Sequence, residues 1–188
     1  MMDLATGATT VVATGPSGHF QYPRFSSDGA AIVYTRFEED LWRVPAGGGE
    51  SVLFLENAFD ASYSPDGTTI AFERWREACL ASCHGGMSEP QIWFADPNGA
   101  NARVLGGVAT ADARWSNDGA RIAFSRAVRR NDETFDGLPV GSTGPGSDRE
   151  NGGVVVVEIA TSGVTTITGH LFPIGWLDAD TLIVQVNG

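Results

Sequence analysis

The chain alternates between short apolar segments, rich in β-branched and aromatic residues, and brief polar segments rich in Gly, Asp and Ser. Apolar segments of about four to eight residues bounded by such turn residues are typical of β-strands. No long amphipathic helical pattern interrupts them, so the pattern predicts an all-β protein. In chain order the predicted strands are 20–25, 30–36, 40–44 and 50–55; 58–63, 68–74, 91–95 and 102–105; 110–115, 120–126, 154–159 and 164–168; and 171–176 and 180–186.

One phrase recurs where the first strand of each group passes into the second. At Tyr63 an aromatic residue is followed by Ser-Pro-Asp-Gly and then by the apolar segment Ile-Ala-Phe. Closely similar copies begin at Phe25 and Trp115, and a degenerate copy begins at Trp176. Asp and Ser side chains bond to nearby backbone, and Gly supplies the positive φ of a tight turn, so each copy predicts a β-hairpin. A recurring unit of this kind indicates a repeat architecture.

The Asp-Gly pairs of these turns are the first candidate functional residues. A ring of carboxylates could bind a cation, but turn formation already explains why Asp recurs at this position. We therefore interpret the pairs as structural. They are Asp28, Gly29, Asp66, Gly67, Asp118 and Gly119.

A second phrase follows the hairpin in each group: an apolar strand, then a turn ending in Gly. It covers Gln91–Gly99, and more loosely Asp40–Gly48 and Val156–Gly163. Together the two phrases resemble the repeat of TolB-like β-propeller proteins over nearly all of the chain apart from two insertions. The resemblance implies a propeller of four-stranded antiparallel blades. It implies less about function, because similar repeats occur in scaffolds and beside hydrolase domains.

The groups predict a single domain over residues 1–188, with blades at 19–55, 58–106 and 109–168. The remaining segments are half-blades: 1–15 resembles the third and fourth strands, and 170–188 the first and second. Pairing them would close a ring of four blades and remove its open edges. Two alternatives stay open: the chain is a fragment of a larger propeller, or the ring does not close within one chain and the half-blades pair in a homodimer.

Two insertions, 75–90 and 127–153, separate the second and third strands of their blades and should therefore emerge on the same face. The second contains few apolar residues, so we expect it to lack fixed structure. Loops on one face of a rigid scaffold are where binding function usually lies. A protein or peptide partner at this face, or in the central channel, is the leading expectation, although insertions without a function are an equal alternative.

The formal net charge of −11 argues against nucleic-acid binding, which needs a basic surface. A solvated acidic surface explains the charge, and a cationic partner would also suit it. No apolar stretch reaches the length of a membrane span, and no signal peptide is visible. Both a cytoplasmic location and a periplasmic or secreted one after removal of a leader agree with the sequence.

The first insertion holds the most chemically specific residues of the chain: Cys79, Cys83 and His84. The haem-attachment pattern Cys-x-x-Cys-His has one residue fewer between the cysteines, and zinc would need a further ligand. Met87 or His19 could supply a second axial haem ligand. A disulfide between the two cysteines is the leading interpretation, free thiols come second, and a metal or haem site is third. We therefore expect no cofactor.

The remaining polar and aromatic candidates favour structure over catalysis. No Gly-x-Ser-x-Gly elbow and no phosphate-binding loop are present. His19 and His170 stand at equivalent repeat positions, which indicates a structural role. The Trp residues also recur in equivalent pairs and are expected between blades, with a ligand funnel as the alternative; the pairs are Trp42 with Trp93, and Trp115 with Trp176. The sequence thus predicts a non-enzymatic binding propeller. The alternatives are a propeller domain that gates a prolyl-oligopeptidase-like hydrolase, and a small metal or haem protein.

Overall fold

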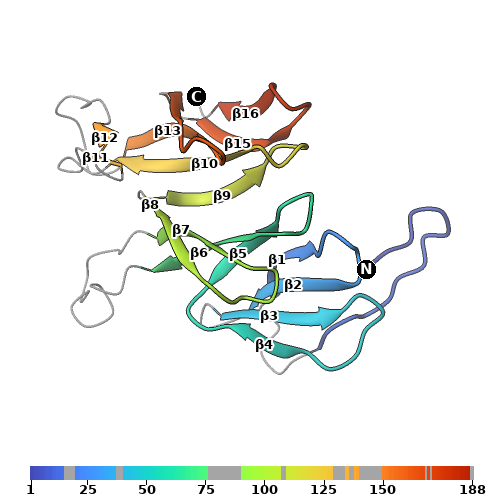
Figure 1. Cartoon of the computed structure of the whole chain (residues 1–188). Coiled ribbons are helices and arrows are strands. Elements are labelled where there is room, and N and C mark those ends of the chain that lie inside the picture. Colours follow the sequence, from blue (N-terminus) through green and yellow to red (C-terminus); the bar gives the residue numbers. More distant parts are fainter. Residues whose placement is uncertain are drawn as a thin grey trace.

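The protein is described here from a computed structural model, and the strands are drawn in Figure 1. The described residues are 1–14, 20–36, 40–75, 90–106, 109–128, 134–135, 138–139, 150–167, 169 and 171–186. Their strands are β1 (Phe20–Phe25), β2 (Ala31–Arg36), β3 (Asp40–Pro45), β4 (Val52–Leu55), β5 (Phe59–Tyr63), β6 (Ile70–Trp75), β7 (Pro90–Ala95), β8 (Arg103–Gly106), β9 (Ala109–Trp115), β10 (Arg121–Val128), β11 (Thr134–Phe135), β12 (Leu138–Pro139), β13 (Glu150–Glu158), β14 (Val164–Ile167), β15 (Leu171–Trp176) and β16 (Leu182–Val186). No helix occurs among them.

The strands form three four-stranded antiparallel sheets, with the orders β1-β2-β3-β4, β5-β6-β7-β8 and β9-β10-β13-β14. We call these sheets blades one, two and three. A two-stranded sheet, β15-β16, lies against β9 on the far side from β5 (Figure 1). The predicted all-β fold with four-stranded antiparallel blades is confirmed.

The recurrent hairpins pair in the same register in every blade. The aromatic that ends the first strand lies opposite an Ile or Leu near the start of the second strand, at Phe25–Ile32, Tyr63–Ile70, Trp115–Ile122 and Trp176–Leu182. A bulge interrupts each first strand a few residues earlier. This common register lets a residue of one blade be matched with its equivalent in the others.

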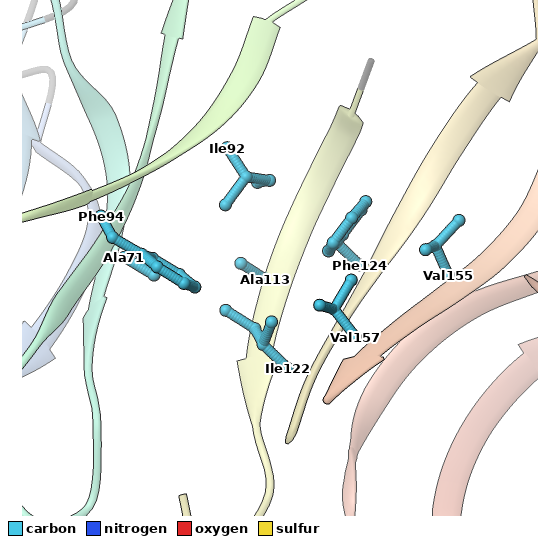
Figure 2. Packing of buried hydrophobic residues seen from close by; sticks show 8 residues of the cluster. All are labelled: Ala71, Ile92, Phe94, Ala113, Ile122, Phe124, Val155 and Val157. Carbon is cyan, nitrogen blue, oxygen red and sulfur yellow. The ribbon is translucent and has the colours of Figure 1, made fainter. Parts of the chain in front are cut away.

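The hydrophobic core lies between blades. One cluster joins Ala71, Ile92 and Phe94 of blade two to residues of blade three, including Phe124 and Val155 (Figure 2). A second cluster joins Val33 and Leu41 of blade one to residues of blade two; these are Ala58, Ala61, Ile70, Phe72 and Ala95. Blades one, two and three therefore bury apolar faces against one another.

The second strand of each blade is apolar on both faces. In β6, Ile70 and Phe72 pack toward blade one, while Ala71 packs toward blade three. In β10, Ile122 and Phe124 likewise pack toward the preceding blade. Successive side chains of a strand point to opposite faces, so an unbroken apolar run is what a strand buried on both sides requires.

The N-terminal segment lies against blade one. Val12 and Ala13 pack on Ile32, Tyr34 and Val44. Before them, residues 1–10 fold back as a hairpin, with a bridge between Met2 and Thr9. Among the described strands, β15 and β16 pair with each other and not with this hairpin. Closure of a four-bladed ring by these two segments therefore stays a prediction.

The second insertion is shorter than expected, and part of it is paired. β10 extends to Val128, and its partner β13 begins at Glu150. Two short strands, β11 and β12, also pair between them. The sequence expectation that 127–153 lacks fixed structure is wrong for these described residues.

We expect Phe124→Ala to destabilise the protein by about 3–5 kcal/mol, because the ring is fully buried between blades two and three and its loss leaves a cavity. Urea unfolding measures the change. Ile167→Ala is the control, because Ile167 lies in the same sheet but is 41% exposed. Equal costs for the two variants would contradict an inter-blade core.

Candidate functional site

The Asp residues of the recurrent turns are occupied within their own turns. Ser116 Oγ donates to Asp118 Oδ1 at 2.6 Å, and the backbone N–H of Ala120 donates to the same oxygen at 3.0 Å. The same bonds recur at Asp28 and Asp66. In all three turns the Ser hydroxyl, first, and the backbone N–H, second, lower the pKa of the carboxyl group below its usual value of 3.8.

The opposite end of the blades carries arginines stacked on tryptophans. We call it the insertion end: β2, β6 and β10 finish there, and β3, β7 and β13 begin. The guanidinium carbon of Arg36 lies 4.8 Å from the ring centroid of Trp42, and that of Arg74 lies 5.0 Å from Trp93. Trp42 and Trp93 are equivalent, since each lies opposite the aromatic residue of the second strand. The two stacks are therefore a repeated feature.

Hydrogen bonds to the segment between blades one and two fix the second of these arginines. Arg74 Nε donates to the Asn57 carbonyl at 3.2 Å, and Nη2 donates to the Glu56 carbonyl at 3.3 Å. The Asn57 N–H in turn donates to Asp40 Oδ1 at 2.7 Å. Beside them the rings of Phe59 and Trp75 lie 5.1 Å apart. The insertion end thus presents arginine and half-buried aromatic side chains on an ordered backbone.

The first strands contribute a buried polar contact between blades one and two. Asp60 is 5% exposed and has a φ of 42°, an unusual value for a residue other than glycine. Its N–H donates to Thr35 Oγ1 at 3.0 Å, and its carboxylate lies 3.9 Å from Arg24 Nη2. Both partners belong to blade one, so the contact holds the bulge of β5 in place across the blade boundary.

An apolar groove of about 740 Å³ opens on the outer side of blade one. Its walls are β1 to β3 and the N-terminal segment. The lining is almost entirely hydrophobic and includes Met1, Met2, Val11, Phe20, Phe25 and Tyr34. Phe25 is 52% exposed there, whereas its equivalents Tyr63, Trp115 and Trp176 are half-buried against neighbouring blades.

The cysteine-containing candidate site lies outside the described residues. This holds for Cys79, Cys83, His84 and Met87, and also for His19 and His170. The disulfide, thiol and metal or haem interpretations stay predictions. Within the described ranges, no three His, Cys, Asp or Glu side chains gather as a metal site would need. The same ranges contain no helix long and apolar enough to span a membrane.

The paired tryptophans of the first strands lie between blades. Trp115 Nε1 donates to the Ser62 carbonyl of blade two at 3.3 Å, and its ring stacks on Phe94 at 5.4 Å. Trp176 Nε1 donates to the Arg114 carbonyl of blade three at 3.0 Å. Each tryptophan thus reaches back to the residue before the equivalent aromatic of the preceding blade.

Two features of these surfaces were missed in the sequence. The arginines follow a visible signal, the triplet of aromatic, polar and Arg residues that recurs as Tyr34–Arg36, Phe72–Arg74 and Phe124–Arg126. The groove has no comparable signal, because it depends on where the N-terminal segment packs.

The fold places the chain among β-propeller proteins, and comparison with solved structures agrees. TolB from Acinetobacter baumannii superposes with a TM-score of 0.60 at 22% identity over 89% of this chain. An oligogalacturonate lyase in complex with manganese gives 0.60 at 14% over 90%. The acylaminoacyl peptidase of Pyrococcus horikoshii gives 0.52 at 20% over 90%. The resemblance to TolB-like propellers is confirmed at the level of fold.

The chain spans a minor part of these proteins. It covers 36% of the TolB chain, 41% of the lyase and 28% of the peptidase. No protein-family model matches the sequence, and no curated protein matches it either. The likeness therefore establishes architecture, and function has to be argued from this chain's own surfaces.

The turn geometry gives a prediction for acid pH. Because the folded-state pKa of Asp118 is lowered, its ionised form stabilises the fold above pH 3.8, and this contribution is lost as the pH falls through the lower folded-state pKa. Ser116→Ala should raise the pKa of Asp118 and leave that of Asp66 unchanged, as followed by NMR of the side-chain carboxyl carbons. Thr165→Ala, on an exposed position of β14, should change neither. An unchanged Asp118 pKa in Ser116→Ala would contradict the role of the hydroxyl.

Proposed function

We propose that this chain is a non-enzymatic binding domain of the propeller type that engages a protein or peptide through its insertion end. The observation that carries the proposal is the repeated stacking of Arg36 on Trp42 and of Arg74 on Trp93. Arginine and tryptophan are enriched among the residues that dominate binding energy at protein interfaces.

The position of the insertions supports the same face. The segment between Trp75 and Pro90, and that between Val128 and Glu150, both leave and re-enter the blades at the insertion end. Binding residues often lie on loops that a rigid scaffold of strands holds in position. The acidic charge of the chain favours a partner of neutral or basic character.

A second candidate is an accessory propeller domain of a larger hydrolase. The fold similarity to acylaminoacyl peptidase favours it. A Gly-x-Ser-x-Gly hydrolase domain in the same natural reading frame would support this candidate. The binding proposal does not need one.

The binding proposal predicts a residue-specific loss of affinity. Peptides selected from a random displayed library on the immobilised chain should bind Arg36→Ala about tenfold or more weakly, because this arginine would lie at the centre of the contact. Isothermal titration calorimetry measures the affinities.

Arg103→Ala is the matched control, because Arg103 also stacks on an aromatic ring, that of Phe94 at 5.7 Å, but toward the opposite end of its blade. It should bind within about twofold of the unsubstituted protein. A selection that returns no binder, or binders that both substitutions weaken equally, would contradict binding at the insertion end.

A further inference from the structure

The contact between blades repeats along the chain with a fixed direction. β5 packs on β1, β9 on β5, and β15 on β9. At the boundaries between the three blades, the second strand of the later blade turns its Ile and aromatic residue toward the earlier blade, as Ile70 and Phe72 do toward blade one. In the second strand of the earlier blade, the residue between the equivalents of this pair faces them. At the boundary between blades one and two this residue is Val33. Each blade therefore has a distinct front face and back face.

The groove is the front face of blade one. Ile32 and Tyr34 are the equivalents of Ile70 and Phe72, and both line the groove. Val12 and Ala13 pack on them, so that only 7% of Ile32 and 3% of Tyr34 is exposed. Phe25 lies beside them and stays exposed, whereas its equivalents in the later blades lie against the preceding blade. The groove thus has the residues that elsewhere in the protein meet the back face of a blade.

The β15–β16 hairpin carries an uncovered back face. By register, Ile183 of β16 is the equivalent of Val33 and Ala71, which are fully buried against the following blade. Ile183 is 43% exposed, and Ile174 of β15 is 55% exposed. The front face of the hairpin contacts blade three, because Trp176 Nε1 donates to the Arg114 carbonyl and Arg121 Nη1 lies 2.6 Å from Asp180 Oδ1.

The backbone edges of the two segments are complementary as well. In every complete blade the second strand pairs with a third, as β2 does with β3. β16 pairs with β15 alone among the described strands. In the N-terminal hairpin, Met1 and Asp3 bond across to Thr10 and Ala8. Alternation along the strand leaves the N–H and C=O of Met2, between them, directed to the outer edge.

We infer that the groove of one copy of this chain receives the β15–β16 hairpin of a second copy. Ile183 of the second copy would lie against Phe20 and Phe25, the lining residues of the groove that are 36% and 52% exposed. The N-terminal hairpin beside the groove would add its outer edge to β16 and complete a four-stranded blade. Within one chain the hairpin packs on blade three, and blade two lies between it and blade one (Figure 1). Two copies joined in this way at both ends form a closed ring in which the edges of β16 and of Met2 are paired.

The inference predicts self-association that strengthens with salt. Each copy carries a formal charge of −11, so screening should favour association through apolar surfaces. Sedimentation equilibrium over a wide concentration range should show a dimer of the 19.8 kDa chain. Phe25→Glu and Ile183→Glu should each weaken dimerisation by about tenfold or more, because the carboxylate would be buried in an apolar contact. Val104→Glu is the control, since Val104 is 42% exposed on β8, outside both surfaces.

Mixing the two variants tests the head-to-tail geometry. Phe25→Glu retains an intact hairpin and Ile183→Glu an intact groove, so an equimolar mixture should associate when neither variant does alone. This complementation also shows that both variants are folded. A chain that remains monomeric at all concentrations and in high salt overturns the proposal. An association that Val104→Glu weakens equally overturns it too. The remaining outcome is a monomer in which Phe25→Glu and Ile183→Glu change the free energy of unfolding non-additively. That result would place the hairpin in the groove of its own chain, and it would overturn a second copy as the occupant.

Discussion

The structure depends on the burial of each blade's two apolar faces by its neighbours. A four-stranded sheet of this size cannot cover its own faces, and the second strands here are apolar on both sides: β10 presents Ile122 and Phe124 to one neighbour and Ala123 to the other. A strand with one solvated face would alternate apolar and polar residues. In the second strands the larger residues face the earlier blade and the smaller ones the later blade, where Ile92 and Phe94 of β7 supply the large side chains instead. This asymmetry gives the stack of blades its direction.

Much of the fold follows from local chemistry and could be read in the sequence. The Ser-x-Asp-Gly turns determine where each hairpin reverses, and their hydroxyl and carboxylate groups are satisfied within a few residues. Because the turn also determines the register, the apolar run that follows it is assigned to faces without ambiguity. The strand boundaries of the first two blades consequently agree with the sequence pattern to within a residue or two.

The parts that could not be read depend on contacts distant in sequence. The bulge at Asp60 is held by Thr35 and Arg24 of another blade, and nothing near Asp60 indicates its positive φ. The N-terminal segment could be recognised as a hairpin, but its place against Tyr34 and Val44 is a tertiary choice. The stacked arginines were visible as a repeat, yet their meaning required the register that places Trp42 and Trp93 one strand away.

The two candidate surfaces differ in physical character, and this difference bears on what each can recognise. At the insertion end, Arg74 stacks on an aromatic ring and donates to two backbone carbonyls. Its side chain is therefore ordered before a partner binds, and a partner that fits this conformation loses little further side-chain entropy, which favours selective binding. The groove beside Phe25 has little polar lining and offers a partner mainly area and an open strand edge. Apolar area alone discriminates poorly, whereas strand pairing requires a matched register. Specificity at the groove must therefore come from the backbone of whatever strand enters it, and at the insertion end from the side chains already in place.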